Sequence, residues 1–139
     1  MSHNVVLDNE AVQALSSPDH PRHRKLLSHM QVVATRKKKA EQIAIVVPTS
    51  VRVEAGWDRT SRAWALANRL GIADVGLDAG HANLATSIRG RVGPHISVVD
   101  AHVGTVIQSS TSQRVTVITS DPADISAVAE ATPVVVVTI

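Results

Sequence analysis

The stretch IAIVV, residues 43–47, is a nearly uninterrupted apolar run with the length of a β-strand. Runs of this kind are typical of strands that helices cover on both faces. Further strand-like runs lie at residues 4–8, 72–77, 114–121 and 133–139, and segments with helical spacing separate them. Because strands that alternate with helices connect through parallel crossovers, we expect an α/β fold. It should be a three-layer α/β/α sandwich with a central, mainly parallel sheet of about five strands.

Apolar spacing and capping residues indicate where the helices lie. Asp8 or Asn9 is a suitable N-cap for the first helix, and Asp78 is a candidate cap further along the chain. Gly71 is suited to end a helix, and Pro48 is suited to the first turn of another. The expected helices cover residues 9–15, 22–42, 49–57, 61–71, 78–90, 95–110 and 123–131.

The composition bounds the class of protein. The chain has 139 residues, of which 44% are hydrophobic, so we expect a single domain over residues 1–139 with one compact core. Cysteine is absent, which excludes disulfides and thiolate metal sites and favours a reducing compartment. Neither a signal-peptide pattern nor an apolar stretch of membrane-spanning length is evident. We therefore expect a cytoplasmic protein with no membrane segment.

Positive charge is concentrated in two clusters, although the formal net charge is only +2. The candidate phosphate-binding residues in these clusters are Arg22, Arg24 and Lys25, followed by Lys37, Lys38 and Lys39. A solvated helix end is an equally good explanation for such a run. Aromatic residues are nearly missing, with only Trp57 and Trp64 present, so a base-stacking platform is not expected.

Acidic side chains follow two of the expected strands, since Asp8 ends the first and Asp121 ends the run at 114–121. In an open α/β sheet, ligands bind outside the carboxyl ends of the strands. Glu54 shares a helix face with Val51 and is expected to point inward, and Asp100 lies beside an apolar helix stripe. We expect these acids to converge at one rim. Taken singly, each is better explained as a cap, a turn residue or a half-exposed helix residue.

Four short motifs occur in a fixed order over nearly the whole chain. They are VVLDNEAV (5–12), VPTSVRVEAGW (47–57), SVVDAHVGTV (97–106) and VTVITSDPADI (115–125). Together they resemble the PIN domain and, within it, the VapC-like toxins of type II toxin–antitoxin systems. Asn9 and Glu10 depart from the small residues that these toxins often have there, and the segment after Asp100 is more polar than usual.

The resemblance implies a Mg2+- or Mn2+-dependent endoribonuclease that hydrolyses phosphodiester bonds in structured RNA such as tRNA. The acidic quartet that binds the metal and catalyses cleavage would be Asp8, Glu54, Asp100 and Asp121. Asp124 is the alternative to Asp121 as the fourth acid. The supporting residues implied by the same comparison are Thr119, Ser120 and Asn9.

The same resemblance implies two protein partners, a cognate VapB-like antitoxin and a second toxin chain in a homodimer. The apolar face of the helix expected over 22–42 is one candidate contact surface. Trp57 and Trp64 are candidate anchors of another, and burial in the core is an equally good explanation for both.

Other classes of function are weighed against this hypothesis. A catalytically degenerate PIN-like module that binds RNA or protein is the main alternative, and its mark would be lost quartet acids. A receiver-type signalling module needs a phosphorylatable Asp at the end of its middle strand and a Lys at the end of its last strand. This chain has neither residue at the required place. The spacing of His20, His23 and His29 disfavours a transition-metal site. A Ser–His–Asp hydrolase would need a G-x-S-x-G motif, which the chain lacks.

Overall fold

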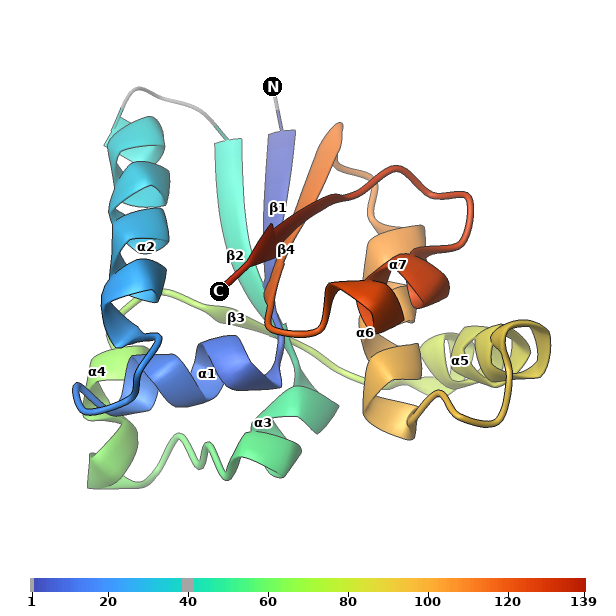
Figure 1. Cartoon of the computed structure of the whole chain (residues 1–139), viewed down its shortest axis with the longest axis horizontal. Coiled ribbons are helices and arrows are strands. Elements are labelled where there is room, and N and C mark those ends of the chain that lie inside the picture. The colour runs from blue at the N-terminus through green and yellow to red at the C-terminus, as the bar shows by residue number, and fades with distance from the viewer. Residues whose placement is uncertain (1, 39–41) are drawn as a thin grey trace.

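The computed structural model describes residues 2–38 and 42–139, leaving aside the side chains of residues 34, 37 and 38. Its centre is a five-stranded sheet, all parallel, in the order β3-β2-β1-β4-β5 (Figure 1). The strands are β1 (Ser2–Leu7), β2 (Gln42–Pro48), β3 (Ala73–Val75), β4 (Arg114–Thr119) and β5 (Val135–Thr138). The expected α/β fold with a parallel sheet is confirmed.

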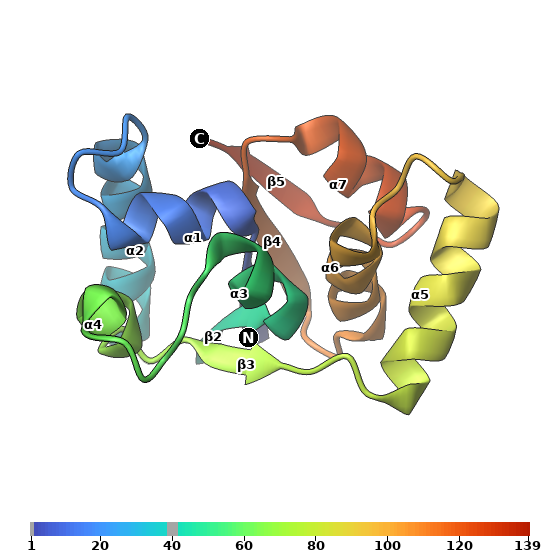
Figure 2. The ribbon, with the colours of Figure 1, turned by 90° about the horizontal axis from the view of Figure 1, so that it is seen from below.

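Helices cover the sheet from both sides and complete a three-layer sandwich. Figure 2 shows α1, α2 and α4 on one side of the sheet and α5, α6 and α7 on the other. The helices are α1 (Asn9–Ser16), α2 (His23–Lys38), α3 (Thr49–Ala55), the short 3-10 helix η1 (Arg62–Trp64), α4 (Ala65–Asn68), α5 (Ala79–Val92), α6 (Val98–Ser109) and α7 (Pro122–Ala129). Across the described residues, none of these helices combines the length and apolar character that a bilayer crossing requires.

The strand order reverses at the boundary between β1 and β4. From β1 the chain moves outward through β2 to β3, and from β4 it moves the opposite way to β5. Because the two halves place their helices on opposite faces, the segments that follow β1 and β4 diverge. A switch point of this kind opens a crevice at the carboxyl edge of the sheet. Asp8 follows β1 and Asp121 follows β4 at this edge.

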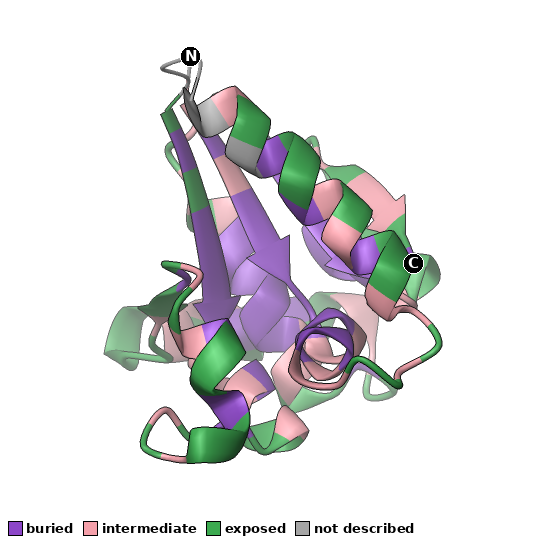
Figure 3. Cartoon of the chain, turned by 90° about the vertical axis from the view of Figure 1, so that its left-hand side faces the viewer, coloured by how far each residue is buried: buried purple, intermediate pink, exposed green. Residues whose placement is uncertain are grey.

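Branched aliphatic side chains fill the space between the sheet and the helices. The central strands are buried along most of their length in Figure 3. In β1 and β4, the side chains of Val5, Leu7, Val117 and Ile118 are at most 2% exposed. Burial from both faces explains why these strands have continuous apolar runs instead of an alternating pattern.

Trp57 and Trp64 belong to this core. Their rings stack with centroids 5.7 Å apart and an interplanar angle of 17°. The Trp57 indole N–H donates a hydrogen bond of 2.9 Å to Asn68 Oδ1, and the Arg59 guanidinium lies 4.4 Å from the Trp57 ring centroid. Trp57 is 2% exposed and Trp64 is 9% exposed. These contacts favour a structural role over that of anchors for a partner.

Some boundaries differ from the sequence expectation. The helix expected over 61–71 is shortened to η1 and α4. Helix α6 begins at Val98 instead of His95, because the Ser97 side chain accepts a hydrogen bond from the Asp100 N–H and caps the helix. Pro48 ends β2 and precedes α3, so it lies outside the first helical turn.

A close approach of α6 to its neighbours yields a first prediction. A Cβ added at Gly104 would lie 2.9 Å from both the Cβ and the carbonyl oxygen of Val128, and 3.2 Å from Ile88 Cδ1. We expect Gly104→Ala to lower the free energy of unfolding by about 1–3 kcal/mol through overpacking. Urea denaturation measures this change.

Gly90 in α5 provides the matched control, because a Cβ added there meets no atom within 4 Å. Gly90→Ala is expected to stabilise the protein by about 0.5–1 kcal/mol through the higher helix propensity of alanine. Equal stability of the two variants would contradict the packing described for α6.

Candidate active site

Asp8 is the buried acid at the switch point. It lies directly after β1, is 8% exposed, and caps α1 by accepting a hydrogen bond of 2.8 Å from the Asn9 N–H to Oδ1. Its other oxygen, Oδ2, accepts a hydrogen bond of 2.7 Å from the Thr119 hydroxyl. Both oxygens are therefore fixed in position by groups that follow β1 and end β4.

Burial raises the pKa of the Asp8 carboxyl above its usual range. The hydrogen bonds from Thr119 and Asn9 act in the opposite direction, while the negative charges of Asp100 and Asp121 raise the pKa further. The influence of these two acids indicates that they share the electrostatic environment of Asp8 although they are distant in the sequence.

Thr119 connects the acids at the ends of β1 and β4. Its hydroxyl donates to Asp8, and its oxygen accepts a hydrogen bond of 2.9 Å from the Asp121 N–H. This supports the position predicted for Thr119. Ser120, predicted alongside it, is partly exposed between Thr119 and Asp121. The Asn9 side chain accepts a hydrogen bond of 3.1 Å from Gln13 Nε2, so its contribution to Asp8 is through its backbone N–H.

Asp121 and Asp124 form a pair at the start of α7. The Asp121 side chain caps this helix by accepting a hydrogen bond from the Asp124 N–H. A hydrogen bond with the Asp121 carboxyl, followed by partial burial and the charges of Asp121 and Asp100, raises the pKa of Asp124. Asp124 therefore belongs to the same group of acids as Asp121, and the choice between them as fourth acid stays open.

Glu54 and Asp100 reach this group from two helices. Asp100 lies in the first turn of α6, and its charge raises the pKa of both Asp8 and Glu54. Partial burial is the largest cause of the raised Glu54 pKa, followed by the charges of Asp8 and Asp100. The prediction that Glu54 points inward is wrong, because its side chain is exposed. Helix α3 has only seven residues, and Glu54 lies in its last turn beyond the buried Val51.

The donor set suits a hard divalent cation that retains part of its water shell. Within residues 2–38 and 42–139, no three histidine or acidic side chains are arranged to hold a metal ion directly. Mg2+ is usually held by one or two carboxylates and several water molecules, so it does not need such a closed cage. Oxygen donors whose negative charges repel one another fit this ion, because it would neutralise them.

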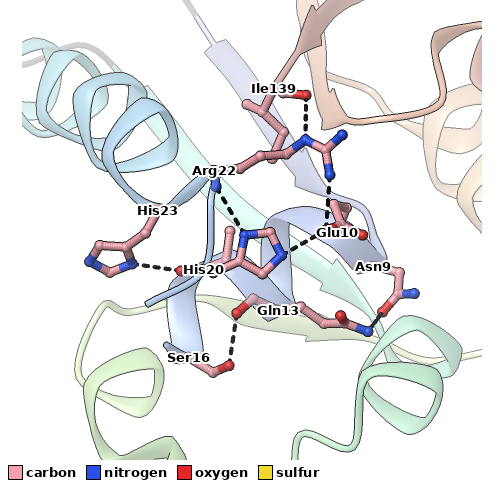
Figure 4. A network of polar contacts seen from close by, with 9 residues as sticks. Asn9, Glu10, Gln13, Ser16, His20, Arg22, His23 and Ile139 are labelled. Atoms are coloured by element: carbon pink, nitrogen blue, oxygen red, sulfur yellow. Dashed lines mark hydrogen bonds and ion pairs between the residues drawn. The ribbon is translucent and has the colours of Figure 1, made fainter. Parts of the chain in front are cut away.

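The first predicted cationic cluster is only partly available for phosphate groups. Figure 4 shows the Arg22 guanidinium between Glu10 and Ile139. Arg22 Nη1 lies 3.1 Å from Glu10 Oε1, and its Nε donates a hydrogen bond of 2.9 Å to the Ile139 backbone oxygen. His20 Nε2 lies 2.7 Å from the same Glu10 oxygen. Arg22 thus stabilises the fold, whereas Arg24 and Lys25 are exposed.

The backbone of Lys37 and Lys38, from the second cationic cluster, lies at the opposite end of the sheet. Helix α2 begins near the carboxyl ends of the strands and ends at Lys38, before β2 starts at Gln42 (Figure 1). At a rise of 1.5 Å per residue, the backbone at Lys38 is roughly 20 Å from that at Arg24. Lys39 lies outside the described residues, as do the side chains of Lys37 and Lys38.

A second polar constellation, which the sequence did not reveal, lies apart from the acids. His81 Nδ1 is 3.0 Å from Asp78 Oδ1, and His81 Nε2 is 3.2 Å from the Ser109 hydroxyl. The Ser109 hydroxyl donates its proton to the Thr105 backbone oxygen. Because that proton is not directed at His81, this chain of contacts lacks the hydrogen bond between nucleophile and base that a Ser–His–Asp hydrolase uses.

Comparisons with known proteins do not assign the chain to a family. A scan against models of protein families and a search of curated proteins both find no match. The structure itself defines the class as a doubly wound α/β sandwich in which Asp8 and Asp121 follow β1 and β4 at the switch point of the sheet.

The raised pKa values yield a prediction on pH dependence. A carboxyl whose pKa is raised by folding holds more protons in the folded state, so stability falls as the pH rises from about 4 through the raised value. We expect Asp8→Asn to reduce this fall and to increase the free energy of unfolding at pH 7 by about 0.5–2 kcal/mol. The asparagine can retain the helix cap.

Thermal and urea unfolding between pH 4 and pH 7 measure the difference. Asp19→Asn is the matched control, because Asp19 is an exposed acid in the loop before α2. It is expected to leave the slope of stability against pH unchanged. A lower stability of Asp8→Asn at pH 7 would contradict the predicted cost of the buried charge.

Proposed function

We propose that this protein is a metal-dependent endoribonuclease of the PIN type. The observation that carries the proposal is the buried Asp8 at the switch point, held by Thr119 and repelled by the charges of Asp100 and Asp121. Electrostatic conflict of this kind is concentrated at functional sites, where a bound cation removes it. The resemblance of the four motifs to VapC-like toxins supplies the substrate class, a structured RNA such as tRNA.

Under this proposal, Asp8 at the end of β1 and either Asp121 or Asp124 after β4 would hold Mg2+ or Mn2+. The bound ion supplies an acidified water and balances charge at the scissile phosphate. Thr119 fixes the Asp8 carboxylate in the orientation needed for binding. Glu54 and Asp100, carried by α3 and α6, would orient water molecules of the site through outer-shell hydrogen bonds.

The biological setting of the proposal follows from the same resemblance. The protein would act in the cytoplasm as the toxin of a toxin–antitoxin pair, as a homodimer, and a VapB-like antitoxin would inhibit it. Exposed Arg24 and Lys25 at the start of α2 are the cations best placed to guide RNA phosphates toward the carboxyl edge of the sheet.

One observation favours a second candidate function, a catalytically degenerate PIN-like module that binds RNA or protein. The described residues contain no ready-made set of three metal ligands. Calorimetric titration with MnCl2 distinguishes the two functions, because the nuclease binds the ion and the degenerate module does not.

The nuclease proposal predicts RNA cleavage that requires Mg2+ or Mn2+ and stops on addition of EDTA. Asp8→Asn should lower the cleavage rate on the order of 100-fold or more while the fold is retained. Denaturing gel electrophoresis of a labelled tRNA pool measures the rate, and circular dichroism checks the fold. Asp19→Asn serves as the control and should cleave at the wild-type rate.

The same measurements on Asp121→Asn and Asp124→Asn identify the fourth acid of the quartet. It is the residue whose replacement lowers the cleavage rate and also weakens Mn2+ binding. Full activity in the absence of divalent ions, or in Asp8→Asn, would exclude the proposed site.

The geometry of α2 predicts how RNA affinity depends on salt. Replacing both Arg24 and Lys25 by glutamine should weaken RNA binding and lower the slope of log K against log salt by about 1 for each lost phosphate contact. Lys37→Gln with Lys38→Gln is the matched control at the far end of α2 and should change the slope less. Filter binding from low to physiological salt measures both, and equal effects would contradict the proposed path of the RNA.

A further inference from the structure

A groove between α2 and β5 lies on a part of the sheet that the helices leave open. Helix α7 packs against β4 and β5 from one face, whereas on the other face α2 packs against β2 and α1 packs against β4. The α2 side of β4 and β5 therefore forms a hollow of about 230 Å3. A smaller hollow of about 170 Å3 continues it around β5 and shares Arg114 and Val135 with it.

The floor of the groove is mainly apolar, with one buried polar pair, His3 and Thr116, whose side chains are 2.7 Å apart. Val5, Val33 and Ile118 line it from three elements and are buried, and Val135 and Val137 line it from β5. Val32 on α2 and Val135 on β5 are 52% and 45% exposed. The run from Pro133 to Val137 has the composition of a strand covered on both faces, yet within the described part of the chain a helix packs on β5 from one face only.

The rim of the groove is cationic. Arg36 and Arg114 line it, and none of its described lining residues is a carboxylate. Among the described residues, neither arginine forms an ion pair. Charge complementarity therefore favours an occupant that combines carboxylates with apolar side chains.

The outer edge of β5 favours an extended peptide as the occupant. Strand β5 pairs only with β4, so one row of its backbone groups has no partner strand among the described residues. An extended peptide can lie along such an edge and alternate its side chains between the groove and the solvent. An RNA strand suits the apolar floor poorly, since no aromatic side chain lines it for stacking.

We propose that this groove is a docking site for an acidic, apolar peptide segment of another protein. The peptide lies along β5, its apolar side chains contact the valines of the floor, and its carboxylates face Arg36 and Arg114. The groove is lined by residues other than the candidate nuclease acids, so the proposal does not depend on catalytic activity.

The test uses the full chain and a fluorescein-labelled decapeptide of alternating glutamate and valine. Fluorescence anisotropy should detect saturable binding that weakens with salt, and a lysine–valine decapeptide should bind on the order of tenfold more weakly. Arg36→Glu combined with Arg114→Glu should weaken binding of the acidic peptide by a similar factor. Arg62→Glu, an exposed arginine of η1, is the matched control and should not change the affinity.

Val135→Asp provides an independent test of the apolar floor and should also weaken binding on the order of tenfold. Since Val135 is an exposed edge residue, this variant is expected to fold, and thermal unfolding checks it. The proposal is overturned if the acidic peptide does not bind, if the lysine–valine peptide binds equally well, or if a labelled oligouridylate binds the groove in its place.

Discussion

The hydrogen bond from the Thr119 hydroxyl to the Asp8 carboxylate joins the two halves of the sheet where they diverge. Strand β1 continues into α1 on one face, and β4 continues into α7 on the other. The same hydroxyl accepts a hydrogen bond from the Asp121 N–H, so one side chain fixes the geometry of both chain segments. This contact determines where the Asp8 carboxyl lies, and the charges of Asp100 and Asp121 act on its pKa from that position.

That charge has an energetic cost that the protein offsets only in part. Burial raises the Asp8 pKa, and two hydrogen bonds to the carboxylate counteract the effect. The negative charge of Asp100 raises the pKa of Asp8 further, and it also raises the pKa of Glu54. Evolution toward stability alone would replace such a residue, whereas a requirement for cation binding would retain it.

The sequence allowed the fold and the positions of Asp8 and Asp121 at one edge of the sheet to be predicted, because both depend on local patterns. The apolar run at 43–47 indicated a buried strand, and Asp8 and Asp121 followed strand ends that belong to one edge of a parallel sheet. The exposure of Glu54 depends on how far α3 extends past its neighbours, which no local pattern determines. The pairing of Arg22 with Glu10 depends on tertiary contacts for the same reason.

The strand order that places Asp8 and Asp121 at the carboxyl edge also leaves two parts of the sheet without a covering helix among the described residues. The side chains that line these two parts differ in polarity. On the α6 side, the hollow next to β2 and β3 is lined by polar groups of Asn4, His81, Ser109, Ser110 and Thr111 as well as by Val46, Val75 and Val106. Polar groups of this kind are satisfied by water and need no protein partner. On the α2 side, valines form the floor beside β5, and water cannot compensate for their exposure. The α2 side combines its apolar floor with the exposed Val135 and Val32, so a partner of the proposed chemistry would contribute most stability there.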